Sequence, residues 1–179
     1  MVFFTADQHF GHQNIIKHSN RPFQTVEEMD EVLLANWNGV VKSQDTVYIL
    51  GDLFFRNNAS AEDYLRRLNG KKHLLIGNHD KDWMKKTDLL RYFESVERMV
   101  EFNDGAHRIT LCHYPMMTWN GIAKGSYMIH GHIHNNTDAD YFALIRNMPN
   151  ILNAGVDVNG YCPVNFNALL KNNEEFKKI

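Results

Sequence analysis

The sequence predicts an α/β protein, a four-layer αββα sandwich in which two mixed sheets pack together and helices cover the outer faces. In the first half, short apolar runs alternate with segments whose apolar residues recur at helical spacing. In the second half, strand-like runs follow one another across turns, several with no helix between them. The 179 residues contain no internal repeat, low-complexity tract or linker. We therefore expect a single domain over residues 1–179.

The first elements are predicted to be a strand, a helix and a second strand. Residues 2–5 form an apolar run long enough for a buried strand, and residues 46–50 form a β-branched second run. Between them, Thr25 and Glu28 make a capping box, after which apolar residues recur at helical spacing as far as Val40. A helix is therefore expected from about residue 25 to residue 40.

The middle of the chain predicts a helix, a strand and another helix. Ser60 is a suitable N-cap for a helix whose apolar face reaches Leu68 and which Gly70 ends. Residues 72–76 are apolar enough for a third buried strand. A further helix is expected around residues 82–91.

The rest of the chain is predicted to be mainly β-structure. Strands are expected at residues 96–102, 108–112, 127–130 and 151–153. Asn165 is a suitable N-cap for a last helix, whose apolar residues are Phe166, Leu169 and Leu170.

Charge, apolar segments and cysteines indicate which partners and which cellular compartment to expect. The net charge is −2, so no global basic field would attract nucleic acid or an acidic membrane. No window approaches the ~20 apolar residues of a membrane span, and the start of the chain lacks the basic segment of a signal peptide. The two cysteines, Cys112 and Cys162, lie far apart, and we expect reduced thiols in a cytoplasmic protein. Because the chain has no global basic field, any affinity for phosphate must come from a local site.

Polar side chains follow five of the predicted strands directly. These are side chains that bind metals or carry protons: Asp7 and His9, then Asp52, then Asn78, His79 and Asp80, then His113, and finally His132 and His134. In parallel α/β sheets the carboxyl ends of the strands meet at one crevice, where ligands bind. Each motif alone is commonplace, but five of them at five strand ends indicate one site.

The order of these motifs resembles the calcineurin-like metallophosphoesterase superfamily. The motifs are Asp-x-His, Gly-Asp, Gly-Asn-His-Asp, a single His and Gly-His-x-His, and they run in order as far as His134. Segments 9–12, 20–23 and 153–157 further resemble compact bacterial and phage members. The resemblance implies a phosphoesterase that binds two metals and attacks a phosphoester bond with a metal-bridging hydroxide. It also implies the ligands: Asp7, His9, Asp52 and His134 for one metal, and Asp52, Asn78, His113 and His132 for the second, with Asp52 shared.

The donor set indicates which metals to expect. Nitrogen and oxygen donors without a thiolate suit divalent transition metals, and they do not suit Ca²⁺, which prefers oxygen alone. Mn²⁺ is the expected ion, with Fe, Zn, Co and Ni as alternatives. Two divalent ions, two carboxylates and a hydroxide leave one positive charge, which would attract an anion.

The resemblance also implies catalytic and substrate-binding residues. His79 would protonate the leaving oxygen, with Asp80 orienting or charging it. Arg56 would contact phosphate oxygens or support its loop, although a surface salt bridge is an alternative for this residue. Three further residues are candidates for substrate binding: His12 as pocket lining or a plain loop residue, Arg21 as a phosphate clamp or a loop tether, and Tyr114 as a stacking surface or a packed aromatic.

The substrate is less well determined than the chemistry. Without an inserted cap domain the metal site should lie in an open groove, which favours a phosphodiester or nucleotide-like substrate. A phosphomonoesterase of the same fold is the alternative, and a non-enzymatic metal-binding scaffold is a second one. RNA or DNA ends are possible substrates, no membrane partner is expected, and the sequence does not indicate an oligomeric state.

Overall fold

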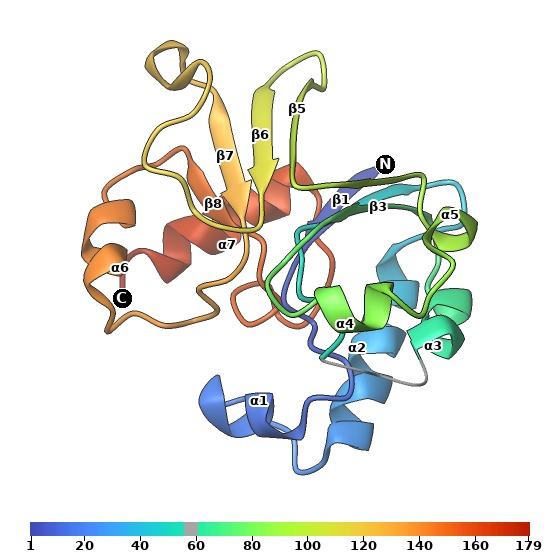
Figure 1. The fold of residues 1–179 in the computed structure, drawn as a ribbon. Helices are drawn as coiled ribbons and strands as arrows, with labels where there is room; N and C mark the ends of the chain where they lie inside the picture. The colour runs from blue at the N-terminus through green and yellow to red at the C-terminus, as the bar shows by residue number, and fades with distance from the viewer. Residues whose placement is uncertain (56–60) are drawn as a thin grey trace.

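The fold is built from two four-stranded sheets, seen side by side in Figure 1. The computed structural model of the chain describes residues 1–55 and 61–179. The first sheet has the order β1 (Val2–Thr5), β2 (Thr46–Ile49), β3 (Lys71–Leu75) and β4 (Ser95–Glu97), all parallel. The second has the order β5 (Met99–Asn103), β6 (Arg108–Cys112), β7 (Tyr127–His130) and β8 (Ile151–Asn153), with β5 antiparallel to its neighbour and the other pairs parallel.

Helices lie outside both sheets. Those of the first half are α1 (Gln13–His18), α2 (Val26–Val40), α3 (Ala61–Arg67), α4 (Lys81–Met84) and α5 (Leu89–Tyr92). Those of the second half are the short 3₁₀ helix η1 (Ile122–Lys124), α6 (Asp140–Ile145) and α7 (Phe166–Phe176). None of the helices in the described part of the chain is long and apolar enough to cross a bilayer.

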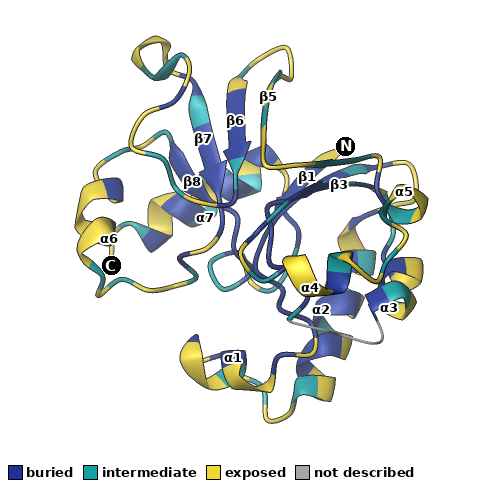
Figure 2. Cartoon of the chain, in the orientation of Figure 1, coloured by how far each residue is buried: buried dark blue, intermediate teal, exposed yellow. Residues whose placement is uncertain are grey.

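Alternating side chains of the strands fill three apolar layers, and the predicted four-layer sandwich is confirmed. In β1, Phe3 packs in the layer beneath α2 and α3, whereas Phe4 faces the second sheet. In β7, Ile129 faces the first sheet and Met128 joins the outer layer with α6 and the end of α7. Figure 2 shows the consequence, since the strands are mostly buried and the exposed residues lie on loops and outer helix faces.

Both N-caps that fall on described residues are confirmed. The hydroxyl of Thr25 accepts a hydrogen bond from the Glu28 amide at 3.2 Å, and the helix α2 follows it. The Asn165 side chain accepts from the Ala168 amide at 3.0 Å at the start of α7. Ser60 lies outside the described residues, and α3 begins in the structure at Ala61.

Two elements that were predicted to be continuous are each divided in two in the structure. The strand expected at residues 96–102 is interrupted at Arg98, where the chain leaves the edge of one sheet and enters the other as β5. The helix expected at residues 82–91 is divided into α4 and α5. There the Thr87 hydroxyl donates to the Trp83 carbonyl at 3.0 Å, which satisfies an acceptor at the end of α4 in place of a helical amide.

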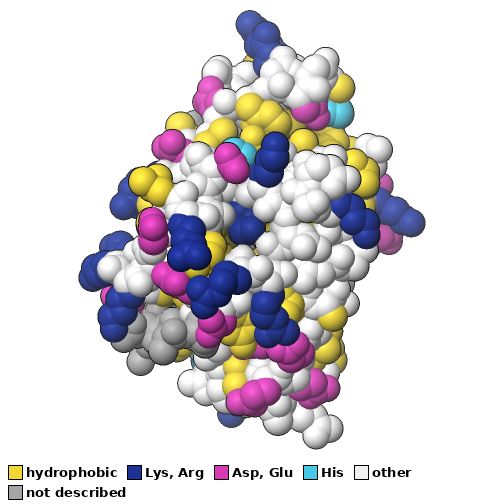
Figure 3. Space-filling view, turned by 90° about the vertical axis from the view of Figure 1, so that its right-hand side faces the viewer, with side chains coloured by type: hydrophobic (Ala, Val, Ile, Leu, Met, Phe, Trp, Pro, Cys, Tyr) yellow, Lys and Arg dark blue, Asp and Glu magenta, His cyan; other side chains and the backbone are white. Residues whose placement is uncertain are grey.

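The face drawn in Figure 3 carries cations interspersed with acidic side chains. On α3, Arg66 forms ion pairs with Glu62 and Asp63, and Arg67 pairs with Glu31 of α2 at 2.7 Å. These exposed pairs contribute little stability, but they balance the arginine charges of this helix locally.

Candidate metal centre

Strand ends from both sheets bring the predicted ligands together. Two groups of donor atoms form among the described residues, and within each group the atoms lie within 4.8 Å of one another. The first group is Asp7, His9 and His134, and the second is Asp52, His113 and His132.

The Asp52 carboxylate lies between the two groups. Its Oδ2 is 3.6 Å from His9 Nε2 and 3.5 Å from His113 Nε2. The amide oxygen of Asn78 lies 2.9 Å from the same Nε2 atom of His113. One carboxylate oxygen is therefore close to donors of both groups.

The backbone is strained where these ligands stand. Seven non-glycine residues in the described part of the chain have positive φ, and five of them are predicted ligands. These five are Asp7, His9, Asp52, His132 and His134, with φ between 51° and 73°. Such conformations cost on the order of 1–3 kcal/mol each and cluster at functional sites. Tertiary contacts must therefore hold these side chains in place.

Glycine is required where the strand ends approach most closely. A Cβ atom on Gly131 would lie 2.6 Å from the Ala6 Cβ and 2.8 Å from Asp7 Oδ2. A Cβ on Gly51 would lie 2.5 Å from His113 Nδ1. The glycines of two motifs thus provide the space in which loops from the two sheets meet.

Asp80 organises the loop around Asp52. Its carboxylate accepts four hydrogen bonds: from the amides of Asp52 (2.9 Å), Leu53 (3.1 Å) and Gly77 (2.7 Å), and from the indole of Trp83 (2.9 Å). None of these four bonds comes from the His79 side chain, so Asp80 acts on the loop backbone, and its predicted role beside His79 stays a prediction. Asp80 connects the loops that follow β2 and β3.

Arg21 is a loop tether in this structure, and the phosphate-clamp alternative is corrected. Its buried side chain forms two hydrogen bonds to Asp157, at 2.8 and 3.0 Å. It also donates to the carbonyls of Asp7 (2.7 Å) and Gln8 (2.8 Å). A guanidinium committed to these internal acceptors does not face the cleft.

Asp157 is the functional residue that the sequence analysis missed. Its Oδ2 accepts from His134 Nδ1 at 2.8 Å, which leaves Nε2 of that ring free for a ligand. Burial opposes protonation of His134, but the Asp7 and Asp157 carboxylates together raise its pKa above the ordinary value. Segment 153–157 was noticed in the sequence, but the pairing of Ala6 with Gly155 that brings it to the site is a long-range contact.

The donor atoms suit a cation. His113 Nδ1 lies 2.7 Å from the Leu50 carbonyl, which can only accept, so this nitrogen carries the proton. Burial lowers the pKa of His113, which keeps the ring neutral, and its unprotonated Nε2 faces the Asn78 oxygen. The buried His9 Nε2 has no hydrogen-bond partner among the described residues. Acceptors that face one another without a proton are satisfied by a metal ion.

The remaining candidates line the cleft or lie near it. The half-buried ring of His79 lies 5.3 Å from His9 and 5.4 Å from Phe55, between ring centres. His12 stacks on Phe55 at 3.4 Å, and burial lowers its pKa to about 4. Tyr114 is exposed, with its ring 4.6 Å from that of His132. Arg56 lies outside the described residues.

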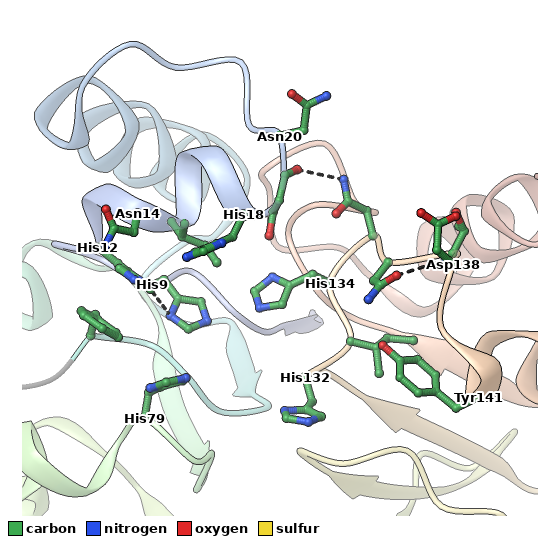
Figure 4. Close-up of a pocket in the computed structure, with 17 residues that line it drawn as sticks. His9, His12, Asn14, His18, Asn20, His79, His132, His134, Asp138 and Tyr141 are labelled. Carbon is green, nitrogen blue, oxygen red and sulfur yellow. Dashed lines mark hydrogen bonds between the residues drawn. The ribbon is translucent and has the colours of Figure 1, made fainter.

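The ligands open into a cleft of about 800 Å³, drawn in Figure 4. His9, His79, His132 and His134 point into it. One wall is α1 with the residues that follow it, and the other is the segment of residues 132–141. The volume is within the range of about 300–1,000 Å³ that is usual for small-molecule sites.

One family model matches almost the whole chain, and several proteins are similar to it over most of its length. The family model described as calcineurin-like phosphoesterase matches residues 2–176. A protein called uncharacterized from Methanocaldococcus jannaschii is 36% identical over 180 residues, covering 99% of this chain and 94% of that protein. The gene 66 protein of Mycobacterium phage L5 is 30% identical, with 74% and 77% covered. The crystal structure of a protein of unknown function from Aquifex aeolicus matches with a TM-score of 0.71 at 31% identity, with 92% and 94% covered.

Asp7→Asn is expected to stabilise the metal-free protein at pH 8. Burial raises the pKa of Asp7 from 3.8 to about 7, so the folded state binds a proton that the unfolded state has released. Stability is therefore lost as the pH rises from about 4 to about 7, by an amount on the order of a few kcal/mol. Thermal unfolding in chelator from pH 5 to pH 8 should show the variant's advantage growing with pH.

The same variant should lose most of the stabilisation that added Mn²⁺ gives the parent protein, because it lacks an anionic ligand. Asp140→Asn, an exposed carboxylate on α6, is the control and should match the parent in both measurements. A constant difference between Asp7→Asn and the parent at every pH would contradict the expectation.

Proposed function

The chain belongs to the calcineurin-like phosphoesterases, a family of metal-dependent hydrolases, and on that premise we propose that it is a binuclear phosphoesterase acting on phosphodiester or nucleotide-like substrates. The observation that carries the proposal is the Asp52 Oδ2 atom, which lies 3.6 Å from His9 and 3.5 Å from His113. A carboxylate between two donor groups is what a shared ligand of two metals requires.

The proposed ligands divide into two sets around Asp52. Asp7, His9 and His134 complete one set, and Asn78, His113 and His132 complete the other. Nitrogen and oxygen donors without a thiolate suit divalent transition metals, of which we propose Mn²⁺, with Fe, Zn, Co and Ni as alternatives. Two divalent ions would supply positive charge that polarises a phosphoryl group and acidifies water near neutral pH.

His79 is the proposed general acid. Its backbone amide donates to Asp52 Oδ1 at 2.9 Å, which ties this residue to the proposed shared ligand. Its ring borders the cleft and belongs to neither donor group, so the proposed metals leave its ring nitrogens available to a substrate. From there it can protonate the oxygen that leaves phosphorus. Asp80 is a proposed positioning residue, because its carboxylate accepts from the amides of Asp52 and Gly77, which lie in the two loops next to His79.

An open cleft supports the preference for diesters. A diester must place organic groups on both sides of its phosphate, and the cleft extends from the proposed metal ligands along α1 and residues 132–141. The exposed Tyr114 ring next to His132 offers a surface on which a base or an aromatic group can stack.

Asp52→Asn is expected to bind neither metal tightly, whereas His134→Ala should lose mainly one. The reason is that the shared carboxylate contributes to both sets and His134 to one. Elemental analysis and Mn²⁺ titration calorimetry should give about two ions per chain for the parent and for Asp140→Asn. Two ions retained by Asp52→Asn would refute the binuclear proposal.

Mn²⁺-loaded protein is expected to cleave an aryl phosphodiester at least as fast as an aryl phosphomonoester. The test is a panel of both compounds together with cyclic nucleotides and short RNA and DNA, which present nucleic-acid ends. Turnover of monoesters alone would replace the proposal with a phosphomonoesterase. Metal binding without turnover of any ester would indicate the metal-binding scaffold.

His79→Asn is expected to slow the cleavage of nucleoside and alkyl esters far more than that of nitrophenyl esters. An alkoxide leaves poorly unless it is protonated, whereas nitrophenolate is stable as an anion, and general acid catalysis contributes ~10²–10⁴-fold. Rate constants for both substrate types, with the metal content of each preparation, test this. Equal losses on both types, or loss of metal, would contradict the acid role.

A further inference from the structure

The cleft continues beyond the metal ligands into a part with different chemistry. Figure 4 shows Asn20 on one side of it and Asp138 and Tyr141 on the other, away from His79. We propose that this part, the distal subsite, binds an uncharged group that carries hydroxyls and is attached to the phosphate, such as the ribose of a single nucleotide unit. The proposal rests on the proposed function and names the substrate class of the same cleft.

The charge of the described lining disfavours a second phosphate. Among the described residues that line the cleft there is no Lys or Arg. Arg21, which follows the lining residue Asn20, is buried against Asp157 and backbone carbonyls, and Arg56, which follows Phe55, lies outside the described residues. Asp138 adds an exposed carboxylate to this part of the lining. Among the described residues of this lining, a second phosphate would therefore meet the Asp138 carboxylate and no Lys or Arg side chain, which disfavours nucleoside diphosphates and internal positions of a polynucleotide.

The same side chains suit hydroxyls. A carboxylate and several amides offer acceptors and donors, and a carboxylate that accepts from a ribose hydroxyl is a common recognition contact. The Tyr141 ring is 37% exposed and can pack against the face of a sugar or base. Amides, one carboxylate and an aromatic ring together favour a polyhydroxyl group over a purely apolar one.

Hydrogen bonds hold the walls of the subsite. The Asn135 side chain donates to the Ser19 carbonyl at 3.0 Å and so joins the segment after β7 to the end of α1. On the second wall, the Asp138 amide donates to the Asn136 side chain at 3.1 Å. The first bond fixes the separation of the walls, and the second fixes the turn that presents the carboxylate.

The test compares diesters that share one leaving group. Mn²⁺-loaded protein is given the 4-nitrophenyl phosphodiesters of methanol, of a ribonucleoside at its 5′ oxygen, of the same nucleoside with a 3′-phosphate, and of glucose at its 6 oxygen. Because nitrophenolate leaves in every case, differences in kcat/KM report the retained group. We expect the ribonucleoside ester to exceed the methyl ester by at least tenfold, and the 3′-phosphorylated ester to lose that advantage.

Variants connect the advantage to the named residues. Asp138→Asn should lower the ratio of kcat/KM between the ribonucleoside and methyl esters by about tenfold, which is typical of losing a charge-assisted hydrogen bond. Tyr141→Ala should lower the same ratio, and Asp138→Lys should raise relative activity on the 3′-phosphorylated ester. Asp140→Asn, two residues away and outside the lining, is the matched control and should keep the parent ratio.

The outcomes separate the subsite from the proposed function. The subsite is refuted, and the proposed function is not, if the methyl ester turns over as fast as the ribonucleoside and glucose esters. The same holds if the advantage of the ribonucleoside ester is unchanged in Asp138→Asn. A larger advantage for glucose supports the subsite and assigns it to a sugar phosphate. If no ester turns over, the proposed function fails. In that case titration calorimetry tests the subsite through binding affinities. A nucleoside 5′-monophosphate should bind at least tenfold more tightly than inorganic phosphate, and at least as tightly as the 5′-triphosphate.

Discussion

The buried ion pair between Arg21 and Asp157 holds together one half of the metal centre. Through Arg21 it binds the carbonyls of the first ligand loop, at Asp7 and Gln8, and through Asp157 it binds the ring of His134. Two residues of one donor group, Asp7 and His134, are thereby tied to one contact between segments 136 residues apart. Loss of one partner would leave a buried charge without compensation, which typically costs about 3–5 kcal/mol.

Asp80 plays the equivalent part for the donor group that contains Asp52. Its carboxylate binds amides in the loops after β2 and β3, so it fixes the backbone of Asp52 from behind. These two buried anchors explain how several ligands can stand at positive φ, because their hydrogen bonds go to the backbone that must be held in that conformation. The local strain of the ligand loops is thus offset by long-range contacts.

This arrangement explains what could be predicted from the sequence. The strands and the Thr25 and Asn165 caps depend on nearby residues, and the strand-end motifs follow from how parallel strands align, so local patterns were sufficient. Asp157 was missed because its partners are distant in the chain. The two roles left open for Arg21 could not be separated, because the sequence does not show the direction of a side chain. The break at Arg98 likewise depends on which sheet accepts the next strand.

The proposed metal ligands and the proposed distal subsite depend on different parts of the structure. The Nδ1 atoms of His113 and His134 are bound to Leu50 and Asp157, so their Nε2 atoms are directed to the centre by the scaffold of both sheets. The proposed distal subsite instead depends on α1 and the segment after β7, which a hydrogen bond between Asn135 and Ser19 joins. Loops of this kind can change without moving the strand ends that hold the ligands. The same set of metal ligands could therefore serve different substrates in related proteins. The residues of the proposed distal subsite, which would select the organic group, are not the residues that would position the phosphate.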